Sequence, residues 1–177
     1  METPMMTPVV EEPSNESWLR GAFQTYESRL IHYARQFVGD WETARDVAQD
    51  SFLKLCQQDR GKVGDPPGAW LYRVTRNRAL DILRHRKRHP HQPAETAEDF
   101  FPQPAPGNTA HDDRLALVWE TLEKLPEQQR EVVRLKFLHG LSYKEIRQVT
   151  GLSESNIGFI IHTAVRTLRG RLQGKQP

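Results

Sequence analysis

The sequence of 177 residues has a single cysteine, Cys56, and no long run of apolar residues. One cysteine excludes both an internal disulfide framework and a zinc site built from several cysteines. The absence of about 20 consecutive apolar residues excludes a membrane-spanning helix. Residues 1–14 hold three acidic residues, no basic residue and no apolar stretch, so we expect no secretory signal and a cytoplasmic location.

Recognisable catalytic motifs are also missing. The sequence contains no Gly-x-Ser-x-Gly, no phosphate-binding glycine loop and no His-Glu-x-x-His. His85, His89 and His91 end a basic run, where metal binding is uncommon, and we expect neither a metal nor a cofactor. Asp46 and Asp50 lie one helical turn apart, with no histidine or third acid at ligand spacing. The chain is therefore not expected to be an enzyme.

The net charge of +2 conceals blocks of opposite sign. Residues 15–90 hold 14 basic and nine acidic residues, and residues 114–177 hold 11 basic and six acidic residues. Residues 91–113, between them, hold five acidic residues and no basic residue. Two basic blocks of this kind suit a polyanionic partner such as nucleic acid, although solvated helix faces are an equally good explanation of the charge alone.

Residues 90–111 are predicted to form a flexible linker. Five prolines lie between Pro90 and Pro106, and proline continues neither a helix nor a central strand. Fully extended, a linker of about 20 residues spans roughly 65–75 Å. The linker divides the chain into an N-terminal domain, 15–89, and a C-terminal domain, 112–173.

The N-terminal domain is predicted to be a bundle of three helices, because apolar residues such as Phe23 recur every three or four positions and never alternate. Gly39 is expected to end the first helix, and Asp40 suits the N-cap of the second. Cys56 falls on the apolar side of that second helix and is expected in the core.

A loop is predicted between the second and third helices, because Gly61 and Gly64 lie close together there. The third helix is expected over 67–88. Asp65 precedes two prolines at its start, and we expect this carboxylate to accept hydrogen bonds from the first N–H groups of the helix.

The C-terminal domain is also predicted to be helical and contains a helix-turn-helix signature. Pro126 opens a helix that ends near Gly140, and Ser142 and Glu145 have the spacing of a capping box. The short helix that follows stops at Gly151, and a longer helix comes next. The expected fold class is therefore all-α, with two small helical domains.

One face of the predicted helix 67–88 carries side chains that suit nucleic acid. Arginines hold phosphates, an asparagine bonds a base edge and an aromatic ring stacks on an unpaired base, so the mixture suits a melted strand better than a closed duplex. A solvated helix face is the alternative. Arg78 falls toward the apolar side and must pair or extend to solvent. The candidate residues on or beside this face are Trp70, Arg73, Arg76, Asn77, Asp81, Arg84 and Arg88.

Several segments, taken in order, resemble bacterial RNA polymerase sigma factors of the extracytoplasmic-function group, in the sigma-70 family. The segments are Asp46–Phe52, Trp70–Asn77, Leu125–Glu127, Gly140–Ile146 and Gly151–Ser153. The resemblance covers about residues 15–88 and 112–172. Both parts occur in the expected order on either side of a linker. This combination indicates the family more specifically than either part alone.

This resemblance implies a protein that binds core RNA polymerase and directs it to promoters. The helix 67–88 would open and read the −10 element, with Asn77 near a flipped base, and the final helix would enter the major groove at the −35 element. The implied partners are core polymerase, promoter DNA as duplex and melted strand, and an anti-sigma protein. The residues expected to bind polymerase are Asp46, Gln49, Asp50 and Phe52.

The predicted −35 helix departs from the family pattern, because its first half carries no basic residue. Arginine-to-guanine readout is therefore absent there, whereas Phe159 suits contact with a thymine methyl group. Gly158 weakens the helix by about 1 kcal/mol relative to alanine. The candidate −35 contacts are Ser153, Ser155, Asn156, Phe159, His162, Thr163, Arg166 and Arg169.

Two alternative functions stay open at this point. A stand-alone helix-turn-helix regulator would bind duplex DNA without polymerase, and it has no use for an acidic face at Asp46 and Asp50. A pure interaction protein that binds polymerase would not need the stripe that contains Arg73, Asn77 and Arg84.

Overall fold

The computed structural model describes residues 14–89 and 118–173, with side chains as far as Arg171. Every regular element in these ranges is a helix, and residues 118–123 are helical too, which confirms the all-α fold class. The predicted linker, 90–111, lies outside the described residues. Within the described part of the chain, no helix combines the length and apolar character that crossing a membrane requires.

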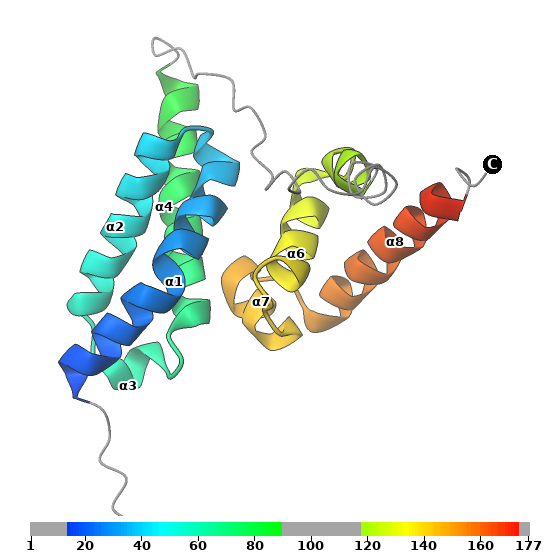
Figure 1. Ribbon diagram of the computed structural model, residues 1–177. Helices are drawn as coiled ribbons and strands as arrows, with labels where there is room; N and C mark the ends of the chain where they lie inside the picture. Colours follow the sequence, from blue (N-terminus) through cyan, green and yellow to red (C-terminus); the bar gives the residue numbers. More distant parts are fainter. Residues whose placement is uncertain (1–13, 90–117, 174–177) are drawn as a thin grey trace, which may run out of the picture.

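Helices α1 (Asn15–Val38), α2 (Trp41–Cys56) and α4 (Gly68–Arg88) pack side by side as the N-terminal bundle (Figure 1). Between α2 and α4, the hydroxyl oxygens of Ser51 and Thr75 lie 2.9 Å apart in the core. This buried pair satisfies two polar groups that would otherwise destabilise the core. The largest fully buried side chains of the bundle are Leu30, Tyr33, Val47, Leu55, Leu71 and Tyr72.

The predicted boundary between α1 and α2 is confirmed. Gly39 has a left-handed φ of 88°, and the carboxylate of Asp40 accepts the N–H of Thr43 at 2.7 Å. The prediction for Cys56 was wrong, because this residue is exposed. It is the last residue of α2, and the inward position in that turn belongs to Leu55.

The connection between α2 and α4 differs from the predicted loop. It contains one helical turn, α3 (Arg60–Val63), and the carboxylate of Asp59 accepts a backbone N–H of that turn at 2.8 Å. Helix α4 begins after Pro67 without a side-chain cap. The predicted cap was wrong because Asp65 is paired with the guanidinium of Arg60, which competes for the carboxylate.

The C-terminal helices are α6 (Glu127–Phe137), α7 (Tyr143–Thr150) and α8 (Glu154–Gln173). The predicted capping box is confirmed at the start of α7, where Ser142 accepts the N–H of Glu145 and the Glu145 carboxylate accepts the N–H of Ser142 at 2.7 Å. The core between these helices contains Val132, Leu135, Ile146, Val149, Ile157, Ile160 and Ala164.

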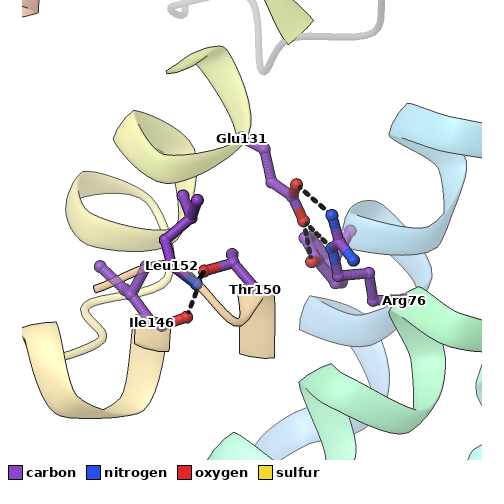
Figure 2. A network of polar contacts seen from close by, with 6 residues as sticks. Arg76, Glu131, Ile146, Thr150 and Leu152 are labelled. Carbon is purple, nitrogen blue, oxygen red and sulfur yellow. Dashed lines mark hydrogen bonds and ion pairs between the residues drawn. The ribbon is translucent and has the colours of Figure 1, made fainter. Parts of the chain in front are cut away.

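The two groups of helices contact each other, chiefly through α4 and α7. The buried carboxylate of Glu131 accepts a hydrogen bond from the Tyr33 hydroxyl at 2.7 Å. It also accepts two from the Arg76 guanidinium at 2.7 and 3.1 Å (Figure 2). The Tyr72 hydroxyl lies 2.9 Å from Nδ1 of His139. We call these five residues the domain contact, because each polar pair joins the N-terminal bundle to a C-terminal helix or turn.

The surroundings of the domain contact shift the pKa of its titratable groups. Burial and the adjacent Glu131 carboxylate raise the pKa of Tyr33 well above its usual value, so its hydroxyl stays protonated and donates. Burial is the main cause that lowers the pKa of His139 to about 4, and the nearby charges of Arg29 and His32 contribute to the same shift. The folded protein therefore holds His139 neutral at pH 7.

The lowered pKa of His139 predicts that the protein loses stability in acid. An unfolded histidine binds a proton near pH 6.5, whereas His139 in the folded protein does not, so acidification favours the unfolded chain. We expect this residue to lower the free energy of unfolding by about 2 kcal/mol between pH 7 and pH 5, measured by urea denaturation.

Matched variants separate His139 from the other titrating groups. His139→Gln should flatten the pH dependence of the unfolding free energy, whereas Gln57→Ala, at an exposed position without a titratable group, should leave it unchanged. The same pH dependence in wild type and His139→Gln would contradict the prediction.

Candidate nucleic-acid interface

The exposed face of α4 carries most of the stripe predicted from the sequence. Arg73, Asn77, Arg84 and Arg88 are all exposed. Trp70, at the edge of the stripe, is partly buried and packs against the core of the bundle. The structure thus brings three cations, one amide and part of an aromatic ring onto one helix.

Two members of the predicted set have partners within the protein. Asp81 accepts a hydrogen bond from Arg84 at 2.6 Å, and both side chains are exposed. Such a surface pair contributes little free energy, so Arg84 can exchange this partner for a phosphate. Arg76 differs, because Glu131 holds its guanidinium within the domain contact. In this arrangement Arg76 is not presented to DNA.

Helix α2 carries the residues predicted to bind polymerase. Asp46 and Gln49 are exposed, and Asp50 is partly exposed and paired with Arg78 at 2.9 Å. Arg78 was predicted to pair or extend to solvent, and it does both, because its side chain is exposed and paired with Asp50. Phe52 does not lie on this surface: it is only 8% exposed.

Sequence reasoning missed two exposed apolar residues of the N-terminal bundle. Phe23 was assigned to the core stripe but is exposed, and its ring packs against Phe52 with centroids 4.9 Å apart. Leu53 is also exposed, and it follows Asp46 and Asp50 by seven and three residues, which places it on the same side of α2. The spacing of Leu53 from Asp46 and Asp50 was a usable signal, because it places this apolar residue on the acidic side of α2.

The turn between α7 and α8 has the geometry of a helix-turn-helix. Gly151 has a left-handed φ of 78° and ends α7, as predicted. The Thr150 hydroxyl donates to the Ile146 carbonyl at 2.8 Å and accepts the N–H of Leu152 at 3.2 Å, which Figure 2 shows. Ser153 accepts the N–H of Asn156 at 3.2 Å and so caps α8.

The exposed face of α8 changes character along its length. Phe159, in the first half, is 66% exposed, and the second half carries the basic residues. Asn156 is exposed beside this face, whereas Thr163 is partly buried. The residues that share the face are Ser155, Phe159, His162, Arg166 and Arg169.

Comparisons with known proteins agree with this geometry. The family Sigma-70 region 2 matches residues 22–89, and the family Sigma-70, region 4 matches residues 115–168. The chain is 29% identical over 159 residues to ECF RNA polymerase sigma factor SigL of Mycobacterium tuberculosis, covering 88% of this chain and 89% of that protein. It is 33% identical over 138 residues to RNA polymerase sigma-H factor of Pseudomonas aeruginosa, covering 70% of each.

A solved structure shows the same fold. The sigma factor RpoE of Bartonella quintana, in complex with the anti-sigma factor NepR, matches with a TM-score of 0.64 at 20% identity, over 89% of this chain and 98% of that chain. The first family match contains α4 and its basic face, and the second contains the helix-turn-helix. The chain therefore belongs to the extracytoplasmic-function group of the sigma-70 family of RNA polymerase sigma factors.

Proposed function

We propose that the N-terminal bundle binds core RNA polymerase and the promoter −10 element, while the C-terminal helix-turn-helix binds the −35 element. The observation that carries this proposal is the presence in one chain of two exposed nucleic-acid faces, on α4 and α8, together with a separate acidic and apolar face on α2. A DNA-binding regulator that acts alone would not need the α2 face.

The exposed side chains indicate which partner each surface binds. Asp46, Gln49, Asp50 and Leu53 offer polymerase a surface with carboxylates and one exposed apolar side chain. Polymerase carries out the chemistry in the cytoplasm, and this chain forms no covalent bond. An anti-sigma protein is a further partner, as it is for the RpoE sigma factor of similar fold.

Run-off transcription tests the proposed function most simply. Purified protein and core polymerase together should give a transcript from the DNA upstream of the protein's own gene. Neither the protein nor the polymerase should give this transcript alone. Absence of a promoter-dependent transcript, with core binding shown to be intact, would contradict the proposal. Specific binding to the same DNA without polymerase, and no transcript, would favour a stand-alone regulator.

For the −10 element, we propose that α4 holds the melted strand with Asn77. The amide has both donors and an acceptor, so it can bond the edge of an unpaired base. Arg73 and Arg84, on the same exposed face, supply phosphate contacts on either side of it along the helix.

Asn77→Ala is expected to impair strand opening more than duplex binding. We expect the equilibrium constant for the open complex, measured by permanganate reactivity of unpaired thymines, to fall about tenfold, since a base-specific hydrogen-bonded pair contributes roughly 1–3 kcal/mol. Gln57→Ala, an exposed amide at the end of α2, serves as the control. Equal losses in permanganate reactivity and in closed-duplex binding would remove Asn77 from this role.

For the −35 element, we propose that α8 reads a thymine through Phe159. The ring is exposed on the face that also carries Arg166 and Arg169, and these cations are placed to hold phosphates while the ring enters the groove. An apolar ring reads the C5-methyl group of thymine, which marks that base in the major groove.

Deoxyuridine, which lacks this methyl group, tests the role of Phe159. Replacing the thymines of the mapped −35 element one at a time should weaken holoenzyme binding about fourfold at one position, as expected for roughly 0.8 kcal/mol per buried methyl group. Phe159→Ala should abolish this effect, and Phe137→Ala, an exposed phenylalanine on α6, should preserve it. A deoxyuridine effect that persists in Phe159→Ala would contradict the assignment.

A further inference from the structure

One acidic side chain lies at the centre of the domain contact. Glu131 belongs to α6 and is 6% exposed. Its Oε1 accepts from Tyr33 of α1 and from Nε of Arg76, and its Oε2 accepts from the second Arg76 nitrogen. The hydrogen-bonding partners of this carboxylate thus come from the N-terminal bundle.

Aromatic rings surround this pair and close the contact. The rings of Tyr33 and Tyr72 lie 5.1 Å apart, and the His139 ring lies 5.5 Å from the first and 5.1 Å from the second. Both tyrosines are fully buried, although their hydroxyls reach the other domain. The contact therefore combines ring packing with polar pairs that depend on the two domains staying together.

This closed arrangement is incompatible with promoter binding by both domains. The −10 and −35 elements are centred about 25 base pairs apart, which is about 85 Å along a duplex with a rise of roughly 3.4 Å per base pair. Helix α4 and helix α7, which belong to the two DNA-binding domains, are in direct contact. Even the 20 residues of α8 span only about 30 Å.

The chain is long enough to let the domains separate. The 28 residues of 90–117 lie between the last described residue of the bundle and the first of the C-terminal domain. At roughly 3.3 Å per residue, that number of residues reaches about 90 Å when extended. Opening thus requires only that the domain contact break.

We propose that the domain contact is autoinhibitory: the pairing of Glu131 with Arg76 and Tyr33 keeps the free protein closed, and core polymerase captures the open form. The inference rests on the proposed function, because it concerns the regulation of the same faces. A buried ion pair suits a reversible contact, because its attraction is largely offset by the hydration that the two charges regain on separation. Opening also frees the guanidinium of Arg76 from Glu131.

Charge reversal tests the closed state in the free protein. Glu131→Arg and Arg76→Glu should each increase the radius of gyration measured by small-angle X-ray scattering, and the double swap should restore the compact value. Glu120→Arg, an exposed position in the same domain, is the control, and circular dichroism shows that every variant is helical. Unchanged scattering in both single variants, or no restoration in the swap, would overturn the proposed pairing.

Binding to core polymerase tests autoinhibition itself. Glu131→Arg leaves the polymerase-binding and DNA-binding faces untouched, so its apparent affinity for core should rise, by about tenfold if the closed form makes up nine-tenths of the free protein. Expansion of Glu131→Arg with unchanged core affinity would overturn autoinhibition and leave the proposed function standing. Failure of wild type and variant alike to bind core would instead count against the proposed function.

Discussion

The carboxylate of Glu131 lies at the centre of the contact between the two halves of this protein. It is buried, and its hydrogen bonds come from Tyr33 and Arg76 on the other domain. A buried carboxylate needs such partners, because removing the charge from water without them is strongly unfavourable. Three other features accompany this pair: α7 lies against α4, aromatic rings cluster around His139, and Arg76 is held away from solvent.

The two faces proposed to bind DNA differ in chemistry, and the difference fits different forms of DNA. On α4, exposed arginines surround Asn77, which suits an unpaired strand with accessible base edges. On α8, an exposed aromatic ring precedes the cations, which suits a closed groove read by shape and by a methyl group. In the proposed function, attachment of both faces to polymerase raises the effective concentration of each face for its DNA element.

Local features were predictable from the sequence because their causes are local. The caps at Asp40 and Ser142 and the end of α7 at Gly151 follow from residue types at fixed spacing. The missing cap at Asp65 and the exposure of Cys56 depend on neighbours that spacing does not specify. On the candidate site, the exposed face of α4 followed from helical periodicity, whereas the domain contact joins residues 98 and 55 positions apart and leaves no periodic signal.

In the proposed cycle, one chain is closed when free and spans both promoter elements when bound to polymerase. Resonance energy transfer between a dye on the native Cys56 of α2 and a dye on Gln148→Cys of α7 measures this directly, since both positions are exposed. Transfer should be efficient in the free protein and should fall steeply in the promoter complex, where the two elements lie about 85 Å apart. Equal transfer in the two states would contradict this cycle.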